Sequence, residues 1–412
     1  MDFKGHLYKY LPIDEVEKLM DSLKEDSYNA LLLNEDKLSK EQLFAHFKSI
    51  SKHPLIDNAY YFDKKEDPLG KSIFHELGAF YIQEPSAMLV SYLLKPNKDD
   101  VVLDMCAAPG GKSIQASLIM NNEGLIISND ISFPRIKALY ENIERLGRSN
   151  IVITNNDFSK IYHHYIDTFD KIILDAPCSG SGMFRKDNKM IDDWSMNKVI
   201  KNSIIQKELI LQAYKMLKPS GIMVYSTCSF SYEEDEEVVK YLLDNTDASL
   251  INIEDNKYFY KSESKIGIHL FPHIFKGEGH YICLIQKPGI SNKKIPIELV
   301  KVSKDNMLSL INIGFNYKFL NVIKNGVLIG ESLKKNIKYS YHYVSYVKDF
   351  ENIIEIDYET LQNYIKGNSL NIKNVYGDVL IKYQNLNVDI AKGDGKSIKN
   401  KLPNFIKNKN LY

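Results

Sequence analysis

Residues 104–112 read Asp-Met-Cys-Ala-Ala-Pro-Gly-Gly-Lys, and this stretch decides how the chain is expected to fold. It follows the apolar run at 101–103 and precedes an apolar helical pattern at 114–119. Two glycines between a strand and a helix let backbone amides approach a ligand closely at the amino terminus of the helix. The pattern Gly-x-Gly-x-x-Gly is absent, so the dinucleotide-binding fingerprint is not met.

Short apolar runs recur after this turn, with helix-length segments between them. They lie at 125–130, 151–153, 171–175 and 222–226. Alternating strand and helix signals predict an α/β fold with a parallel, doubly wound sheet. The clearest helical pattern extends to Leu217, and Pro-Ser-Gly at 219–221 is expected to end this helix just before the last of these strands.

Three of the four cysteines follow these expected strands, at Cys106, Cys178 and Cys228. Ligands bind at the carboxyl edge of an open α/β sheet, so this placement predicts an enzyme site there. Cys178 and Cys228 stand beside small or turn-forming residues, where a side chain can project into a crevice. Cys106 and Cys283 lie in apolar surroundings and are expected to act as small hydrophobic residues.

Two carboxylates follow consecutive strands, Asp130 after the second and Asp157 after the third. At these positions a carboxylate can accept hydrogen bonds from ribose hydroxyls or lie beside an adenine edge. Each could instead cap a helix or close a turn. Together with the glycine turn, they predict a site for a cofactor that contains adenosine but no pyrophosphate.

Composition sets only broad bounds on the function. Lysine plus arginine equals aspartate plus glutamate, at 53 each in 412 residues, so the global charge neither favours nor excludes nucleic acid. No apolar run approaches the roughly 20 residues that span a bilayer, and residues 1–6 lack a secretion signal. We expect a cytoplasmic monomer with no membrane association. The dispersed cysteines predict free thiols and no metal.

The chain is expected to divide into three domains. Residues 1–75 form an accessory module, residues 76–288 carry the chemistry, and residues 289–412 form a separate domain rich in asparagine, lysine and tyrosine. The last stretch concentrates six lysines, Lys392, Lys396, Lys399, Lys401, Lys407 and Lys409. They could bind RNA phosphates while Phe405 and Tyr412 stack on bases, or they could form a solvated tail.

Three ordered motifs resemble those of the Sun-type RNA (cytosine-5) methyltransferases, which use S-adenosylmethionine. They are residues 104–112, Asp-Ala-Pro-Cys-Ser-Gly-Ser-Gly at 175–182, and Ser-Thr-Cys-Ser at 226–229, with weaker matches at 83–86 and 277–281. The C-terminal region is similar, at 326–331 and 399–403, to the PUA-like extension of the bacterial branch that modifies 16S ribosomal RNA. The resemblance implies a Rossmann-like sheet flanked by an N-terminal α/β RNA-binding module and a PUA-like RNA-binding domain.

The resemblance also assigns roles to residues. It implies that the Cys228 thiolate adds to carbon 6 of cytosine and that Cys178 assists release of the product. Asp175 would hold ring nitrogen 3 and the exocyclic amine, as a protonated carboxyl or through a hydrogen bond, and Lys112 would lie at the catalytic centre. Cofactor contacts are implied at Cys106, Ala107, Ala108, Pro109, Gly110, Gly111, Lys112, Asp130, Arg135, Asp157 and Asp175.

Other functions are considered beside this one. The chain could methylate cytosine in transfer RNA, or it could be a non-catalytic RNA-binding factor in ribosome assembly. Methyltransferases that act on proteins or amino groups commonly end the fourth strand with Asn-Pro-Pro-Tyr, which differs from the sequence at 175–178. Two departures from the family stand out: Leu32 replaces an arginine two positions before Asn34, and Tyr232 replaces a proline.

The remaining charged motifs are expected to be structural. Ser231 with the acids at 233–237 predicts a capping box at a solvated helix start, rather than a metal site. The histidines lack tight ligand spacing and are expected to be ordinary structural or RNA-facing residues. They are His163, His164, His269, His273 and His280.

Overall fold

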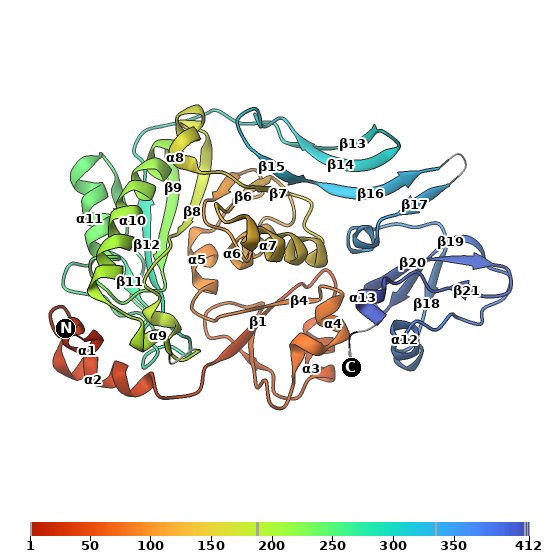
Figure 1. Cartoon of the computed structure of the whole chain (residues 1–412), viewed down its shortest axis with the longest axis horizontal. Coiled ribbons are helices and arrows are strands. Elements are labelled where there is room, and N and C mark those ends of the chain that lie inside the picture. Colours follow the sequence, from red (N-terminus) through yellow and green to blue (C-terminus); the bar gives the residue numbers. More distant parts are fainter. Residues whose placement is uncertain (1, 187–188, 334–335, 408, 410, 412) are drawn as a thin grey trace.

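The computed structural model describes residues 2–186, 189–333, 336–407, 409 and 411 (Figure 1). Its central sheet has the strand order β10-β12-β9-β8-β5-β6-β7-β15, with β11 paired to β12. The bounds are β5 (Val101–Asp104), β6 (Leu125–Asn129), β7 (Ile151–Thr154), β8 (Phe169–Asp175), β9 (Leu217–Thr227), β10 (Ser249–Ile251), β11 (Ile268–His269), β12 (Tyr281–Gln286) and β15 (Val322–Asn325). Strands β5 to β9 pair in parallel, which confirms the predicted doubly wound sheet, and the others join its two sides antiparallel.

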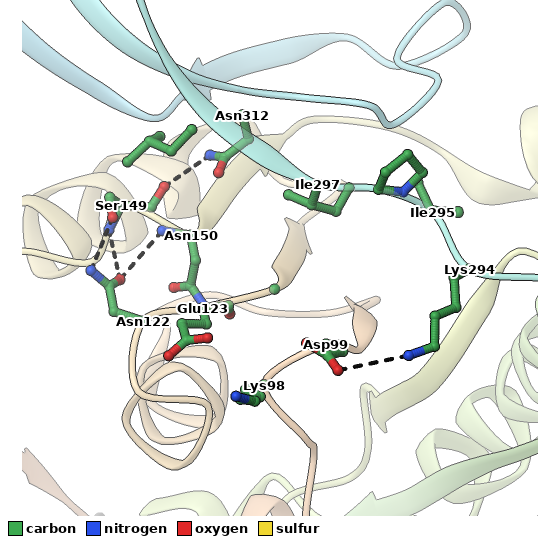
Figure 2. A pocket seen from close by; sticks show the side chains of 13 residues that line it. Lys98, Asp99, Asn122, Glu123, Ser149, Asn150, Lys294, Ile295, Ile297 and Asn312 are labelled. Atoms are coloured by element: carbon green, nitrogen blue, oxygen red, sulfur yellow. Dashed lines mark hydrogen bonds and ion pairs between the residues drawn. The ribbon is translucent and has the colours of Figure 1, made fainter.

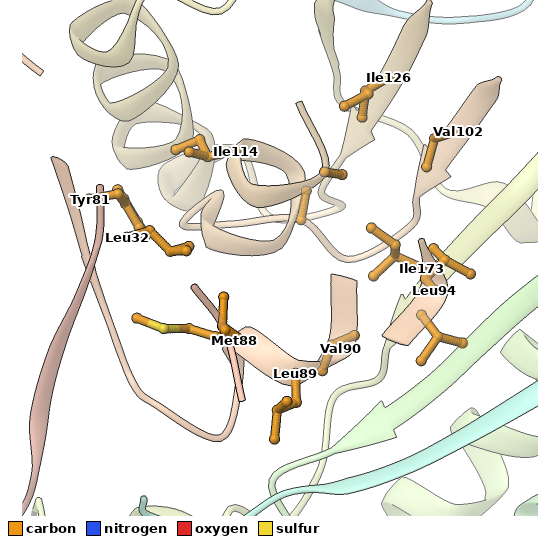
Figure 3. Close-up of a cluster of buried hydrophobic side chains, with 14 of the residues drawn as sticks. Leu32, Tyr81, Met88, Leu89, Val90, Leu94, Val102, Ile114, Ile126 and Ile173 are labelled. Carbon is orange, nitrogen blue, oxygen red and sulfur yellow. The ribbon is translucent and has the colours of Figure 1, made fainter. Parts of the chain in front are cut away.

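Helices cover both faces of this sheet, because its strands are apolar on both sides. One core contains Val102, Ile126 and Ile173 from the strands, packed against Met88 and Ile114 (Figure 3). The alternate strand residues face a second core with residues of other helices. The helices are α5 (Met88–Leu94), α6 (Gly111–Ile119) and α7 (Phe133–Leu146) on the first face, and α8 (Phe158–Ile161), α10 (Met196–Met216) and α11 (Glu236–Asn245) on the second.

The end of α10 differs from the sequence prediction. The helix ends at Met216, before Pro219 as expected, but Leu217 already belongs to β9 and pairs with Phe169. The segment 219–221 therefore lies within the strand, and the pairing with β8 shifts register there. Leu217 is wrongly predicted as helical because pairing with a neighbouring strand overrides the local helical pattern.

The N-terminal part begins with two helices that pack against the part with the central sheet, α1 (Phe3–Leu7) and α2 (Ile13–Ser22). A second sheet follows, in the order β2-β3-β1-β4, so it extends to Gln83. Its elements are β1 (Asn29–Leu33), α3 (Lys40–His46), β2 (Ser51–Lys52), β3 (Ala59–Phe62), α4 (Ile73–Glu76) and β4 (Phe80–Gln83). Leu32 is buried in β1, and Asn34 accepts a hydrogen bond from Arg148 Nη2 at 2.9 Å. The guanidinium that contacts Asn34 therefore comes from Arg148, just after the end of α7, and not from position 32.

The C-terminal region forms two further sheets, β13-β14-β16-β17 and β18-β19-β20-β21. Their elements are β13 (Glu298–Lys304), β14 (Met307–Ile313), β16 (Val327–Ser332), β17 (Ile337–Tyr339), β18 (Ile353–Glu355), α12 (Tyr358–Ile365), β19 (Tyr376–Tyr383), β20 (Leu386–Asp394), β21 (Ile398–Lys399) and α13 (Asn404–Lys407). The last sheet shares one hydrophobic core with the N-terminal sheet, and Figure 1 shows the two lying against each other.

This shared core changes the interpretation of the lysine-rich segment. Ile398, Leu402 and Ile406 are buried, so the segment is packed rather than a free tail. Lys392, Lys396, Lys399 and Lys401 nevertheless remain exposed. Tyr412 and the side chain of Phe405, the two expected stacking groups, lie outside the described residues. Across the part of the chain that the structure describes, no helix has the length and apolar character needed to cross a membrane.

Candidate active site

The carboxyl ends of β5, β6, β8 and β9 form one edge of the central sheet. Strand β5 lies between β6 and β8, so the chain leaves the sheet in opposite directions on its two sides. Loops that diverge in this way open a crevice at the edge. The glycine turn, the Cys178 loop and the Cys228 loop all start there, as the sequence predicts.

The two loops that carry the thiols are joined by backbone hydrogen bonds. Ala176 N donates to Ser226 O at 2.9 Å, and Gly182 N donates to Cys228 O at 2.7 Å. The Sγ atoms of Cys178 and Cys228 consequently lie 2.9 Å apart, and both thiols are free and partly exposed. The structure brings together two cysteines that are 50 positions apart in the sequence.

Either sulfur can donate the hydrogen bond between the two thiols. The hydrogen bond with Cys228 is the largest cause that raises the pKa of the Cys178 thiol well above 9, and burial is the second. The nearby carboxylates of Glu234 and Asp175 act in the same direction. Cys178 therefore keeps its proton at neutral pH, and its hydrogen can point at the Cys228 sulfur.

Asp175 lies at the centre of a charged group beside the thiols. Its Oδ2 is 2.7 Å from Lys112 Nζ, and its Oδ1 accepts a hydrogen bond from Ser226 Oγ at 2.8 Å. Burial alone would raise the pKa of Asp175, but Lys112 and His280 outweigh it, so this pKa is lowered. Burial would lower the pKa of Lys112, but Asp175 outweighs it, so this pKa is raised. The pair is a carboxylate and an ammonium, which favours the hydrogen-bonding role of Asp175 over the protonated one.

His280 belongs to this site, although the sequence predicts only an ordinary structural or RNA-facing role for it. Its Nε2 is 3.4 Å from Asp175 Oδ1, and its Nδ1 is 3.8 Å from Glu84 Oε2. Tyr281 of β12 pairs with Thr227 of β9. This pairing places His280, the residue before Tyr281, beside the loop that carries Cys228. The two weaker family matches, at 83–86 and 277–281, contain Glu84 and His280 and were the signal for them.

The glycine turn leads into α6 with Gly110 at φ +111°, a conformation that favours glycine. No side chain caps α6, so its first backbone amides can bind an anionic group such as a carboxylate. Asp104 is fully buried, and its Oδ1 has no partner among the described residues, whereas Oδ2 accepts from Ser113 Oγ. Burial raises the pKa of Asp104 to about 7. These donors and acceptors fit the amino acid part of S-adenosylmethionine.

Asp130 is buried at the end of β6 and fixes the turn. Its Oδ2 accepts a hydrogen bond from Ala108 N at 3.2 Å and lies 3.1 Å from Arg135 Nη1, and Arg135 also donates to Ala108 O. Asp157 caps α8 by accepting from Ser159 N, the capping role that the sequence left open. Contacts of Asp130, Arg135 and Asp157 with a nucleoside stay predictions.

Cys106 and Cys283 have no thiol partner among the described residues. Burial raises the pKa of both thiols, that of Cys283 to about 12, so both stay neutral. Cys283 is buried in β12 within the second core, the structural role expected from its sequence. Cys106 is partly exposed at the end of β5 and remains a predicted cofactor contact.

The acidic run at 233–237 differs most from its prediction. Helix α11 begins at Glu236, and Glu234, Asp235 and Glu236 are buried rather than solvated. The prediction of a capping box is wrong. Ser231 Oγ has no hydrogen-bond partner among the described residues, and the Glu234 side chain instead binds the loops that carry Cys178 and Cys228. The prediction failed because a capping pattern is local, whereas these acids bind groups from other strands.

Asp235, Glu236 and His269 offer ligand atoms within 4.8 Å of one another. Contacts within the protein use one atom of each residue, while Asp235 Oδ2 and His269 Nδ1 have no hydrogen-bond partner among the described residues. Thr227 Oγ1 donates to Asp235 at 2.5 Å, and His269 Nε2 lies 2.9 Å from Glu236 Oε1. His269 thus has the structural role expected from its sequence, and His273 similarly lies 2.9 Å from Glu15.

Comparison with known proteins identifies the family. Three family models match: the 16S rRNA methyltransferase RsmB/F at residues 91–286, the N-terminal domain of 16S rRNA methyltransferase RsmF at 1–85, and the methyltransferase RsmF PUA domain at 351–405. A solved structure titled as a methyltransferase homolog from Pyrococcus horikoshii is 28% identical, with a TM-score of 0.60, and the match covers 69% of this chain and 93% of that one.

Two curated relatives have the same name, ribosomal RNA small subunit methyltransferase F. The protein of Vibrio vulnificus is 31% identical over 85% of this chain and 84% of its own length. That of Shewanella oneidensis is 30% identical over 84% of this chain and 83% of its own length. The chain belongs to the family of ribosomal RNA small subunit methyltransferase F and is an S-adenosylmethionine-dependent RNA methyltransferase.

Proposed function

We propose that this chain methylates carbon 5 of a cytosine in 16S ribosomal RNA. The observation that carries the proposal is the pair of thiols 2.9 Å apart beside the Lys112–Asp175 ion pair. Methylation of a nitrogen or oxygen atom needs no protein nucleophile. Carbon 5 of cytosine is a poor nucleophile, so its methylation does need a group that adds to carbon 6.

Cys228 is the nucleophile in this proposal. The Cys228 thiol gives its proton to solvent, the thiolate sulfur bonds to carbon 6, and the electrons of the carbon 5–carbon 6 double bond move toward carbon 5 and the ring. The Asp175 carboxylate accepts hydrogen bonds from the exocyclic amine and from nitrogen 3 when that nitrogen is protonated. Lys112 holds this carboxylate in place from the opposite side, at 2.7 Å. When bound, S-adenosylmethionine supplies the methyl group that carbon 5 takes up.

Cys178 takes the proton from carbon 5 at the end of the reaction. The largest cause of its raised pKa is the hydrogen bond with Cys228. That cause is lost once the Cys228 sulfur is bonded to the base and carries no charge. The pKa of Cys178 then falls, so Cys178 gives its own proton to solvent and is a thiolate at the stage where a base is needed. Removal of the proton restores the carbon 5–carbon 6 double bond and expels Cys228 as a thiolate.

The RNA must present its cytosine outside a base-paired stack, since thiols at a sheet edge cannot reach carbon 6 within a duplex. The exposed lysines at 392, 396, 399 and 401 supply positive charge for the flanking phosphates. Changing these four to glutamine, which leaves the buried residues of the segment in place, should weaken RNA binding and reduce its dependence on salt. The affinity for S-adenosylmethionine should not change.

Bisulfite mapping of cellular RNA, with and without the gene, tests the proposal. A cytosine in 16S ribosomal RNA should lose its protection when the protein is absent and regain it with the wild-type protein. Protection lost only in transfer RNA would move the substrate to that class. If deletion impaired ribosome assembly but left the protection of all RNA unchanged, the result would favour the non-catalytic role.

A further inference from the structure

We propose that Glu234 is a positioning residue that sets the two catalytic thiols against each other. This inference rests on the proposed function, because it assigns Glu234 to the cysteine chemistry. Glu234 is fully buried and lies in the segment between β9 and α11. Its carboxylate contacts the residue that follows each thiol.

The first set of contacts holds the Cys178 loop. Ser179 N donates to Glu234 Oε1 at 2.8 Å, and Ser179 Oγ donates to Oε2. Gln206 Nε2 donates to the same Oε1 at 3.3 Å and to Pro177 O at 2.8 Å. The residues on both sides of Cys178 are thus held by one carboxylate and one amide from α10.

The second set of contacts holds the Cys228 loop. Ser229 Oγ donates to Glu234 Oε2 at 2.6 Å, so this oxygen accepts hydrogen bonds from both serines. The backbone of Glu234 is itself fixed, since Tyr225 Oη donates to its carbonyl oxygen at 2.6 Å. Tyr225 lies in β9, the strand that ends at Thr227, directly before Cys228. The carboxylate is therefore held in place by the strand whose loop it positions.

These contacts call for an acceptor with two oxygens. A carboxylate can accept several hydrogen bonds at once, whereas an amide has one oxygen and an NH₂ group that donates. Ser179 N and Gln206 Nε2 donate to Oε1, and the hydroxyls of Ser179 and Ser229 donate to Oε2. An amide would place NH₂ at the position of Oε2, where both hydroxyls would have to turn round to accept, and their stronger bonds to a charged acceptor would be lost. Weaker bonds in this buried site let the loops move apart, and a misplacement of about 1 Å can cost about a hundredfold in rate.

Glu234→Gln is the direct test, with kcat for RNA methylation and KM for S-adenosylmethionine measured separately. We expect kcat to fall about a hundredfold while KM for S-adenosylmethionine stays within twofold. Glu234→Asp keeps the charge and should recover part of kcat. The matched control is Glu237→Gln, which removes only a surface ion pair with Lys207 and should leave kcat unchanged. A wild-type kcat in Glu234→Gln would overturn the proposal.

The two serines separate positioning from a general loss of stability. RNA containing 5-fluorocytosine traps the covalent complex, because the fluorine on carbon 5 cannot leave as a proton does. Ser229→Ala should slow formation of this complex about tenfold. Ser179→Ala should form it at the wild-type rate but release the methylated product of ordinary RNA about tenfold more slowly. Equal effects of both changes on both steps would overturn the proposal. If the wild-type protein methylates RNA without any trapped complex, the proposed function fails instead.

Discussion

The two edges of the central sheet carry different kinds of polar side chain. At the carboxyl edge lie charged groups and thiols, with the Lys112–Asp175 ion pair 2.7 Å long and the sulfur atoms 2.9 Å apart. At the amino edge lies a cavity of about 680 Å³, where buried or half-buried asparagine side chains bind serine and backbone groups and the charged side chains are exposed, including the ion pair of Lys294 and Asp99 at 3.8 Å (Figure 2). Asn122 accepts from Ser149 N, and Asn312 Nδ2 donates to Ser149 O.

The difference concerns which groups can change charge or form bonds. At the amino edge, the amide groups of Asn122, Asn150 and Asn312 are neutral and hydrogen-bonded, so they stabilise the turns that precede the strands. At the carboxyl edge, burial and opposed charges shift pKa values, which is typical of active sites. Substitutions at the carboxyl edge should therefore reduce activity more than stability, and those at the amino edge should do the reverse.

The largest effect is expected from Cys228→Ser at the carboxyl edge. A serine hydroxyl is a far weaker nucleophile than a thiolate, so kcat should fall about a thousandfold or more and no trapped complex should form. The melting temperature should stay close to that of the wild type. Cys283→Ala, in the buried part of β12, is the control and should lower stability without removing the trapped complex. Wild-type methylation by Cys228→Ser would refute the mechanism.

Cys178→Ala should have a smaller effect on rate but a distinctive product. Carbon 6 can still be attacked, but the base that takes the proton from carbon 5 is missing, so the protein should stay attached to ordinary RNA. We expect turnover to fall about a hundredfold while a single methyl transfer still occurs. A denaturing gel with labelled RNA measures the attached protein. Attachment in Cys228→Ala instead would reverse the two roles.

The alkylation of Cys178 by iodoacetamide should depend on pH in a way that Cys228 controls. A raised pKa means that Cys178 keeps its proton to higher pH. Its labelling should therefore begin only at a pH well above ~8.5, the pKa of an ordinary cysteine. Cys228→Ala removes the largest cause of the shift, so the midpoint should move to lower pH. Mass spectrometry of the labelled peptide measures both. An unchanged midpoint would mean that the two thiols are not coupled.

The sequence predicts the carboxyl edge better than it predicts the contacts around it. Cys106, Cys178, Cys228 and Lys112 follow strands or begin a helix, and a parallel sheet brings such positions to one edge whatever the details of packing. Glu234 and His280 could not be placed in the same way. Their roles depend on loops and an antiparallel strand that approach from elsewhere in the chain. The weak family match at 277–281 was the one signal for His280, and no local pattern marks this role of Glu234.

The same reasoning explains the error at α10. The helical pattern continues through Leu217 in the sequence, but the pairing of Leu217 with Phe169 makes this residue part of a strand. The lysine-rich segment is a similar case, because its burial depends on a core shared with the N-terminal sheet. Composition showed its charge, and only the packing of distant elements showed that Leu402 and Ile406 fix it in place.

The smallest effect on activity is expected at the amino edge, from Asn150→Ala. Asn150 is buried, accepts from Ser117 Oγ at 2.6 Å and donates to Glu123 O at 2.6 Å. Its loss leaves both partners unsatisfied and should lower the free energy of unfolding by roughly 1–3 kcal/mol. At a temperature where the variant is folded, kcat should remain within twofold of the wild type. Lys98→Ala, on the exposed rim of the same cavity, is the control and should change neither quantity.

Asn150→Ala is the sharpest test of the comparison because β6 connects the two edges directly. Ile126 N donates to Asn150 O near the start of β6, and Asp130 follows the end of the same strand. If the strand transmitted strain along its length, the loss at Asn150 would disturb the glycine turn through Asp130, and KM for S-adenosylmethionine would rise. An unchanged KM in a destabilised protein means that each edge is held by its own hydrogen bonds, so the sheet separates stability from catalysis.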